Sequence, residues 1–243
     1  MGRGSHDKNY KVVKNHYGKE LRSQDENYKF VIDTSISIDD YVPINISKSN
    51  SEIQQFDVSS SSEWSKYIKN YLHKYNAKVA YGGYLEERDL YNRSNQFSSE
   101  ESSKNRNIHL GVDFWCEANT SVLAIVRGRV HSFQNNLGIG NYGPTIILEH
   151  YIQGEIFYSL YGHLSLESIE NVEIGQFVED GEKIGEVGDA SINGDYAPHL
   201  HFQIIEDLQG HSGDYPGVSS LENLAFYKDN CPDPNFILKF LKS

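Results

Sequence analysis

Short apolar runs separated by glycine and polar residues dominate the chain between about residue 108 and residue 206. Runs of four to eight residues with β-branched or aromatic side chains, bounded in this way, are typical of β-strands. The pattern predicts strands at Leu110–Trp115, Ser121–Phe133, Thr145–Tyr151, Glu155–Gly162, Glu182–Val187 and Leu200–Glu206. This part of the chain therefore predicts a mainly β domain with an antiparallel β-sheet.

The segment before it, residues 7–77, is more polar and carries weaker structural signals. Lys29–Ile32 and Tyr41–Ile46 resemble short strands, the second because its apolar residues alternate. Ser59–Ser62 offers N-caps for a helix. The apolar side chains of that helix recur at helical spacing, at Trp64, Tyr67, Ile68, Tyr71 and Leu72. Because so short and polar a segment makes a poor core alone, we expect the helix to pack on the main domain.

The pattern divides the chain into a short N-terminal remnant and three larger segments. Residues 1–6 look like the remnant of an expression tag. Residues 7–77 form an N-terminal extension, residues 78–210 the main domain, and residues 211–243 a C-terminal extension. Asp233-Pro234 predicts the start of a terminal helix. The buried face expected for that helix comprises Phe236, Ile237, Phe240 and Leu241.

Composition narrows the class of protein. Of the 243 residues, 38% are hydrophobic, which is enough for a packed core, and no apolar run approaches the ~20 residues of a membrane-spanning helix. A formal net charge of −12 argues against nucleic acid as a partner, because phosphates would be repelled. Cys116 and Cys231 leave one disulfide or two free thiols as alternatives. Oligomeric state is not predicted.

Two histidines share one face of the last predicted strand. In an extended chain alternate side chains point to opposite faces, so His199, His201 and Gln203 lie on one face. The intervening Leu200 and Phe202 are apolar and must face the core. Two imidazoles then stand on an open sheet face with Cα atoms roughly 6–7 Å apart. One of them can bind a metal ion while the other reaches a group bound to it.

A second polar set precedes it in His109-Leu-Gly-Val-Asp113. Alternation places His109, Gly111 and Asp113 on one face and the apolar residues between them on the other. Imidazole nitrogen and carboxylate oxygen are both common zinc ligands. The same spacing could occur on a helix, but the glycine and the aromatic pair that follows favour a strand.

A fourth histidine, His163, follows Tyr161 and Gly162 at the end of a predicted strand. Alternation predicts that Tyr161 and His163 share a face, with Gly162 permitting close approach. Each of these motifs is common by itself. Three of them in one β domain, each opposite an apolar face, indicate a single site.

Together these motifs resemble the lysostaphin-type zinc metallopeptidases, which cut peptides in bacterial cell walls. The residues that carry the resemblance are H-L-G-V-D at 109–113, Y-G-H-L at 161–164, A-P-H-L-H-F-Q at 197–203 and the glycine-punctuated segment 175–188. The resemblance covers about residues 78–206 and implies a barrel-sandwich hybrid fold of the duplicated-hybrid-motif type. Similar glycine punctuation occurs in biotinyl and lipoyl carrier domains, but no suitable hairpin lysine is present here.

The resemblance also implies roles. His109, Asp113 and His201 would hold one Zn²⁺ per chain, leaving a coordination position open as in catalytic zinc sites. His163 and His199 would be the catalytic residues; we favour His163 as general base and His199 as stabiliser of the oxyanion, although the two could be exchanged. Zinc lowers the pKa of bound water towards ~7 and so supplies a nucleophile for hydrolysis.

The expected activity is that of a zinc metalloendopeptidase acting on the stem peptide or cross-bridge of peptidoglycan. The alternatives are a zinc peptidase on a non-wall, intracellular peptide and a catalytically silent binding module. The family implies a periplasmic or secreted protein, but the sequence shows no signal peptide, so a cytoplasmic location is the alternative.

For the substrate we expect an open groove walled by the polar loops Gln134–Tyr142, Gln96–Asn107 and Asp189–Tyr196. Tyr142 and Tyr161 are candidate substrate-binding residues within that groove. Gly111 and Gly162 suggest close approach of the backbone to a ligand, and therefore small residues beside the hydrolysed bond.

Overall fold

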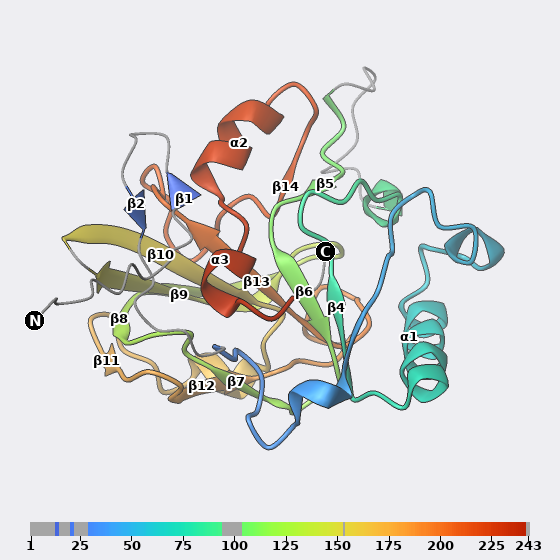
Figure 1. Cartoon of the computed structure of the whole chain (residues 1–243), viewed down its shortest axis with the longest axis horizontal. Coiled ribbons are helices and arrows are strands. Elements are labelled where there is room, and N and C mark those ends of the chain that lie inside the picture. Colours follow the sequence, from blue (N-terminus) through green and yellow to red (C-terminus); the bar gives the residue numbers. More distant parts are fainter. Residues whose placement is uncertain (1–12, 15–19, 22–28, 94–103, 153, 242–243) are drawn as a thin grey trace, which may run out of the picture.

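The structure is a computed structural model that describes residues 13–14, 20–21, 29–93, 104–152 and 154–241. An eight-stranded sheet in the order β11-β8-β9-β10-β13-β6-β4-β3 forms its centre (Figure 1). All neighbours pair antiparallel except β3 and β4, which are parallel. The prediction of a mainly β, antiparallel fold is therefore confirmed.

The strands of this sheet are β3 (Tyr41–Pro43), β4 (Val79–Gly82), β6 (Val112–Trp115), β8 (Gly128–Asn136), β9 (Gly143–Ile152), β10 (Glu155–Gly162), β11 (Phe177–Val178) and β13 (His199–Ile205). Three two-stranded pairs join β1 (Val13–Lys14) to β2 (Glu20–Leu21), β5 (Ile108–His109) to β14 (Val218–Ser219), and β7 (Ser121–Leu123) to β12 (Lys183–Glu186). The helices are α1 (Ser61–Tyr75), α2 (Leu224–Asn230), α3 (Asn235–Leu238) and the short 3-10 turns Ile38–Asp40, Ile53–Gln55, Leu90–Arg93 and Leu166–Ile169.

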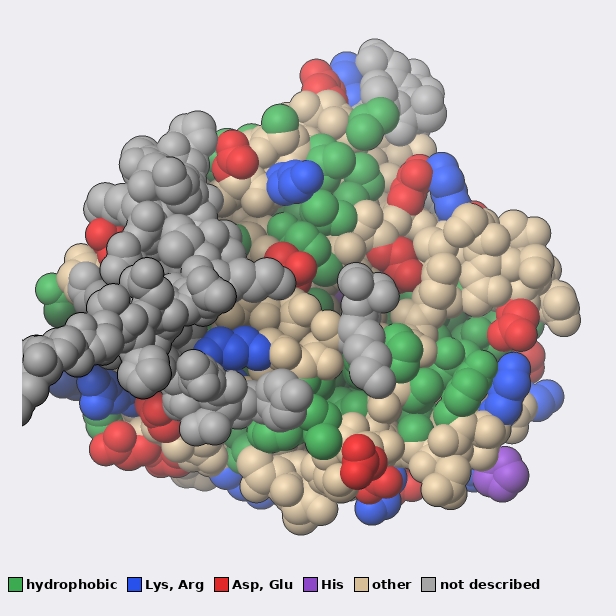
Figure 2. Space-filling model, in the orientation of Figure 1, with side chains coloured by type: hydrophobic (Ala, Val, Ile, Leu, Met, Phe, Trp, Pro, Cys, Tyr) green, Lys and Arg blue, Asp and Glu red, His purple; other side chains and the backbone are tan. Residues whose placement is uncertain are grey.

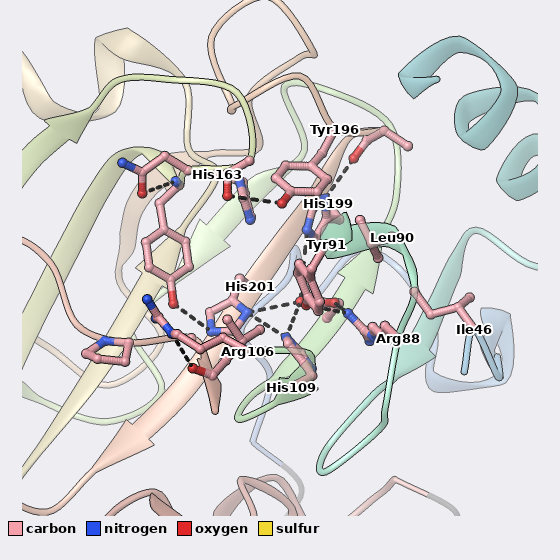
Figure 3. A pocket seen from close by; sticks show the side chains of 18 of the residues that line it. Ile46, Arg88, Leu90, Tyr91, Arg106, His109, His163, Tyr196, His199 and His201 are labelled. Atoms are coloured by element: carbon pink, nitrogen blue, oxygen red, sulfur yellow. Dashed lines mark hydrogen bonds and ion pairs between the residues drawn. The ribbon is translucent and has the colours of Figure 1, made fainter. Parts of the chain in front are cut away.

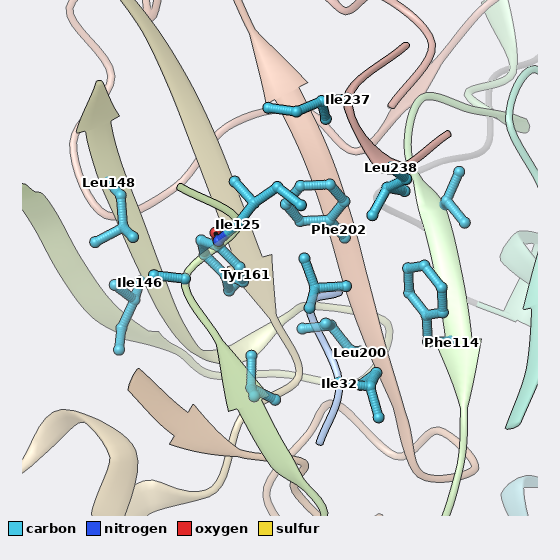
Figure 4. Packing of buried hydrophobic residues seen from close by; sticks show 14 of the residues in the cluster. Ile32, Phe114, Ile125, Ile146, Leu148, Tyr161, Leu200, Phe202, Ile237 and Leu238 are labelled. Carbon is cyan, nitrogen blue, oxygen red and sulfur yellow. Dashed lines mark hydrogen bonds between the residues drawn. The ribbon is translucent and has the colours of Figure 1, made fainter. Parts of the chain in front are cut away.

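One face of the sheet carries the main apolar core (Figure 4). Alternate residues of β13, including Leu200 and Phe202, point into it together with Phe114 of β6. Ile237 and Leu238 of α3 close this core from the C-terminal end of the chain. The alternation of side chains predicted for β13 is thus present in the structure.

The opposite face is covered by two smaller clusters. One joins Ile46, Trp64 and Ile68 of the N-terminal extension to Trp115 and other residues of the sheet face. The other packs Leu110 and Leu160, among others, beneath the C-terminal segment that contains Tyr215 and Cys231. The polar residues of β6 and β13 lie on this same face, so both extensions help to enclose them.

Helix α1 begins where the sequence predicts. Ser60 is the N-cap and its hydroxyl accepts a hydrogen bond from the Glu63 amide at 3.3 Å. Trp64 and Ile68 are its buried residues. The stripe packs on the sheet, while the division of the chain at residue 78 stays a prediction.

Three predicted elements differ from the structure. The predicted strand 121–133 is broken between β7 and β8, because the Ile125 amide turns to the Tyr161 hydroxyl at 2.9 Å and leaves the ladder. Lys29–Ile32 is not a strand; it contributes only a bridge from Ile32 to Val122. The C-terminal extension contains α2 in addition to the predicted terminal helix.

The predicted strand 110–115 is shorter in the structure, and the His109 that was expected to continue it belongs to a separate strand, β5. His109 in β5 pairs with Val218, and β6 begins only at Val112. The Leu110 amide bonds to the Gly217 carbonyl at 2.9 Å, which directs Leu110 away from the core that holds Val112. The predicted single apolar face of this segment is therefore wrong.

The structure also bears on membrane spans, on the two cysteines and on surface charge. Among the residues that the structure describes, no helix is long and apolar enough to cross a bilayer. Cys116 and Cys231 are buried free thiols, which decides between the two alternatives left by the sequence. Figure 2 shows acidic side chains spread over the face in view with Lys and Arg side chains between them.

Removing the N-terminal extension is expected to destabilise the protein. A chain that begins at Lys78 loses β3 and the residues of α1 that cover Trp115, so it should melt at lower temperature and bind a hydrophobic dye. Thermal unfolding and dye fluorescence measure this. Lys69→Ala, an exposed change on α1, is the control and should leave both unchanged. Equal melting of the truncated and full chains would instead show that residues 78–241 fold independently.

Candidate metal centre

Three side chains that could bind a metal ion meet on the enclosed face of the sheet. His201 on β13 and Asp113 on β6 are direct cross-strand partners, so their side chains stand next to each other. His109 comes from β5, which is separated from β6 by Leu110 and Gly111, two residues outside both strands. All three are buried and place one donor atom each within 4.8 Å of the others.

The separations of the three donor atoms fit a small cation. His109 Nε2 lies 2.8 Å from His201 Nδ1, and each nitrogen lies 3.2 Å from Asp113 Oδ1. Zinc–ligand bonds of about 2.0–2.1 Å at tetrahedral angles place neighbouring donors about 3.3–3.4 Å apart. The triangle is therefore close to the size that zinc requires.

Neighbouring groups determine which imidazole nitrogens carry protons. His109 Nδ1 lies 2.9 Å from the Gly83 carbonyl, which can only accept, so Nδ1 donates and Nε2 carries a lone pair. His201 Nε2 lies 2.9 Å from Gln203 Oε1, which leaves the lone pair on Nδ1. Two nitrogen lone pairs and a carboxylate oxygen then face one another. Such an arrangement is repulsive unless a cation lies between them.

Burial and a neighbouring charge keep His109 and Asp113 in the protonation states that a metal ion needs. Burial lowers the pKa of His109 to about 3, so its imidazole is neutral. Burial alone would raise the pKa of the Asp113 carboxyl, but the Arg88 guanidinium, which bonds to Asp113 Oδ2, holds it well below its usual range. Neutral imidazoles and an ionised carboxylate are the ligand forms of zinc.

His163 and His199 lie beside the donor group, with ring centres 4.2 Å apart (Figure 3). His163 Nδ1 lies 2.8 Å from the Asn193 carbonyl and His199 Nδ1 lies 2.7 Å from the Ala197 carbonyl. Each therefore donates through Nδ1 and keeps a lone pair on Nε2. Burial lowers the pKa of both histidines, so both are neutral proton acceptors.

These five residues lie at the bottom of a pocket of about 310 Å³ rather than on an open sheet face. None of them is more than 5% exposed. The predicted open groove is wrong because the two extensions cover the face: Ile46 and Trp64 line the pocket on one side, and residues 211–218 on the other.

The three predicted loops contribute to the pocket unequally. Gly140, Asn141 and Tyr142 come from the first loop and Tyr196 from the third. Arg106 is the pocket residue from Gln96–Asn107, whose residues 96–103 lie outside the described part of the chain. The tag-like residues 1–6 also lie outside it.

Comparison with known proteins bears on the segment that holds the site. Residues 107–213 match the model of peptidase family M23, and this segment contains all five residues. Lysostaphin of Staphylococcus staphylolyticus is 35% identical over 99 residues, which make up 41% of this chain and 19% of that protein. The chain carries a lysostaphin-type M23 peptidase domain. Since it spans about a fifth of this relative's length, the activity of the whole relative does not transfer with the match.

Solved structures resemble the same part of the chain. The catalytic domain of the antimicrobial peptidase lysostaphin from Staphylococcus simulans is 31% identical and aligns with 50% of this chain and 80% of its own, at a TM-score of 0.34. A zinc-containing peptidase from Vibrio cholerae is 26% identical over 44% of this chain and 30% of its own, at a TM-score of 0.33. The family assignment rests on the sequence match.

Sequence patterns missed Arg88, which lies outside the matched M23 segment. Its side chain is 1% exposed, and Nη1 bonds to Asp113 Oδ2 at 2.6 Å while Nε bonds to Glu86 at 2.7 Å. Asp113 is thereby held with only Oδ1 facing the histidines. Gly83 makes room for this arginine, since a Cβ there would lie 1.9 Å from Arg88 Nη2.

The structure separates Tyr161 from the pocket. Tyr161 is fully buried in the main core, and its hydroxyl bonds to Ser159 and to the Ile125 amide. His163 turns to the other face because its φ is +63°, a left-handed conformation uncommon outside glycine. This turn breaks the alternation on which the shared face was predicted. A substrate-binding role for Tyr161 therefore has no support in this site, whereas Tyr142 does line the pocket.

The two glycines of the M23 motifs serve packing inside the protein. A Cβ on Gly111 would lie 2.6 Å from the Phe202 carbonyl oxygen and 2.8 Å from His201 Cε1. A Cβ on Gly162 would lie 2.6 Å from the ring of Tyr142. We expected these glycines to admit a substrate backbone. In the structure, Gly111 makes room for His201 and Gly162 makes room for Tyr142.

Gly111→Ala is accordingly expected to disturb the metal centre. Its φ is not in the left-handed region, so the effect comes from the contact with His201 and Phe202 alone. We expect a loss of about 1–3 kcal/mol in the free energy of unfolding and weaker zinc binding. Denaturant unfolding and competition with a zinc chelator measure the two effects. Unchanged zinc affinity would show that His201 can shift without cost.

Proposed function

We propose that this chain is a zinc metalloendopeptidase that hydrolyses peptide bonds in bacterial cell-wall peptidoglycan, either in the stem peptide or in the cross-bridge. The observation that carries the proposal is the set of three lone pairs that converge in a buried site of an M23 domain. A protein gains nothing by holding such donors together unless a cation binds them.

His109, Asp113 and His201 are the proposed ligands of one zinc ion per chain. Three protein ligands leave one position for water or substrate, which is the arrangement of catalytic zinc sites. Zinc supplies a Lewis acid that polarises a carbonyl and acidifies water near neutral pH. Gly83, Gln203 and Arg88 orient the ligands, as outer partners commonly do in metal sites.

His163 and His199 are the proposed catalytic residues. Both present Nε2 as a proton acceptor, so either can take a proton from the attacking water. After it gains that proton, the same ring becomes a donor that can stabilise the oxyanion or protonate the leaving amine. We favour His163 as the general base and His199 as the oxyanion stabiliser; their equivalent hydrogen bonds allow the opposite assignment.

The peptidoglycan substrate is proposed from the likeness to lysostaphin, a protein described as an antimicrobial peptidase. Tyr142 is the proposed substrate-binding tyrosine, because its ring borders the pocket and its hydroxyl lies 3.4 Å from His201 Nε2. An extended substrate would enter from the mouth of the pocket, where Arg106 and Asp214 offer polar contacts.

Mass spectrometry of purified peptidoglycan tests the proposal. The zinc-loaded protein should release peptide fragments, and a chelator should prevent their release. His73→Ala, an exposed change on α1, is the control and should cleave normally. Cleavage of unrelated peptides but not of peptidoglycan would favour a non-wall peptidase. Zinc binding with no cleavage of either would favour a silent binding module.

A further inference from the structure

One short turn of the chain, residues 193–197, holds both proposed catalytic histidines. His163 Nδ1 donates to the Asn193 carbonyl at 2.8 Å, and His199 Nδ1 donates to the Ala197 carbonyl at 2.7 Å. These two bonds orient the rings and so set the direction of each Nε2 lone pair. A shift of the 193–197 turn would therefore move both proton acceptors relative to the donor group.

Bonds to its own residues and to a neighbouring loop hold the 193–197 turn in place. The Asn193 side chain is fully buried, and its Oδ1 accepts from the Tyr196 amide at 2.9 Å. The Gly194 carbonyl accepts from the Gly140 amide at 2.9 Å. The ring of Tyr196 packs edge-on against both histidines (Figure 3). The turn thus contacts the two imidazole rings directly as well as through its carbonyl groups.

Asp195, in the middle of this turn, is also held by the N-terminal extension. Its backbone has a φ of +63°, a left-handed conformation that is uncommon outside glycine and persists where other contacts hold it. Ser61 Oγ donates to Asp195 Oδ1 at 2.5 Å, across 134 positions of the sequence. Ser61 is the first residue of the 15-residue helix α1, so the carboxylate lies at a helix N-terminus, where negative charge is favoured.

This bond joins the extension to the proposed catalytic residues without touching the pocket. Within the described part of the chain, neither Ser61 nor Asp195 is among the residues that line the pocket. Any effect of the two side chains on hydrolysis must therefore pass through the 193–197 turn. Ser61 also lies before residue 107, where the M23 match begins.

We propose that Ser61 and Asp195 are a positioning pair, whose bond fixes the 193–197 turn and thereby the directions of the His163 and His199 rings. The inference rests on the proposed function, because it takes these two histidines as catalytic residues. The N-terminal extension then does more than enclose the pocket, since one of its side chains sets the geometry of proton transfer. Proton transfer depends on that geometry more than substrate binding does, so loss of the pair should lower kcat and leave KM nearly unchanged.

Two single variants break the bond from its two ends. Ser61→Ala removes the donor, and Asp195→Gly removes the acceptor while glycine keeps φ +63° without strain. On the full zinc-loaded chain, each should lower kcat for a peptide released from peptidoglycan about tenfold, with normal zinc content and normal KM. Ser61→Thr keeps a hydroxyl at the same position and should keep near-normal kcat.

Two comparisons show whether the effect comes from the bond itself. Ser62→Ala removes the next hydroxyl of α1, which is exposed and bonds to Ser60 Oγ, and should leave kcat unchanged. The double variant Ser61→Ala with Asp195→Gly should lose no more kcat than the more affected single variant, because both changes break the same bond. Losses that multiply in the double variant, or a normal kcat in Ser61→Ala, would overturn the pair.

A second measurement separates this inference from the proposed function. NMR of the metal-free protein can follow the exchange with water of the Nδ1 protons of His163 and His199, which are buried and hydrogen-bonded. Ser61→Ala should speed this exchange severalfold, whereas Ser62→Ala should not. If the unaltered zinc-loaded chain cleaves no peptide, the zinc function fails and the exchange alone decides. Faster exchange then supports the link from Ser61 to the two rings, and unchanged exchange overturns it.

Discussion

An Asp113→Ala variant is expected to lose zinc and also to unfold more easily in the absence of any metal. Loss of zinc follows because Asp113 Oδ1 completes the donor triangle with two imidazoles at 3.2 Å. Loss of stability follows because Asp113 Oδ2 neutralises Arg88, which is 1% exposed and cannot move to water. Breaking a buried pair by removing one partner costs about 3–5 kcal/mol. Glu86 still pairs with Arg88, so we expect the lower end of that range.

Metal analysis and denaturant unfolding of the metal-free protein measure the two losses. Asp214→Ala removes a carboxylate from the same pocket but outside the donor group, and should keep its zinc. A double variant, Asp113→Leu with Arg88→Met, removes both charges and should recover part of the lost stability, although not the zinc. Full zinc occupancy in Asp113→Ala would show that the carboxylate is not a ligand.

The sequence predicted β13 and its histidines well because period-two alternation is a local property. Leu200 and Phe202 enter the core, so His199 and His201 are forced to the other face whatever else surrounds the strand. Placement of the five motif residues around one pocket agrees with what those motifs suggested. Their roles as ligands and catalysts stay predictions.

Alternation failed where the backbone leaves the extended conformation. The break before Val112 moved Leu110 to another cluster, and the positive φ of His163 turned that ring away from Tyr161. In both cases the cause is a tertiary contact: the Leu110 amide bonds to Gly217, and the His163 amide bonds to the Tyr142 carbonyl. No local pattern reports such contacts.

Residues distant in sequence were also beyond prediction. Arg88 reaches Asp113 across 25 positions, and the pocket is enclosed by side chains from both extensions. In the sequence, Arg88 could be an ordinary surface residue, and the apolar side chains of the extensions could be ordinary core residues. The sequence therefore predicted that the motif residues share a sheet face, but it could not show that other segments cover that face. For this reason the sequence analysis predicted an open groove.

His163→Ala and His199→Ala are expected to keep zinc and to lose activity about 100-fold or more, the usual contribution of general acid–base groups. Neither residue belongs to the donor triangle, since the described group that can hold a metal consists of His109, Asp113 and His201. Zinc content and turnover of a peptide released from peptidoglycan give the two measurements. His73→Ala, on the exposed side of α1, is the control for both.

The backbone at His163 requires one more variant. Alanine at φ +63° is strained, so a loss of activity in His163→Ala could arise from a shifted chain. Asparagine tolerates the left-handed region and lacks the imidazole, so His163→Asn should lose activity to the same extent with a normal melting temperature. In both rings Nε2 carries a lone pair that can accept a proton during the reaction. Removal of either imidazole should therefore lower kcat more than it raises KM. If one variant kept near-normal turnover, the other histidine alone would have to move the proton and stabilise the oxyanion.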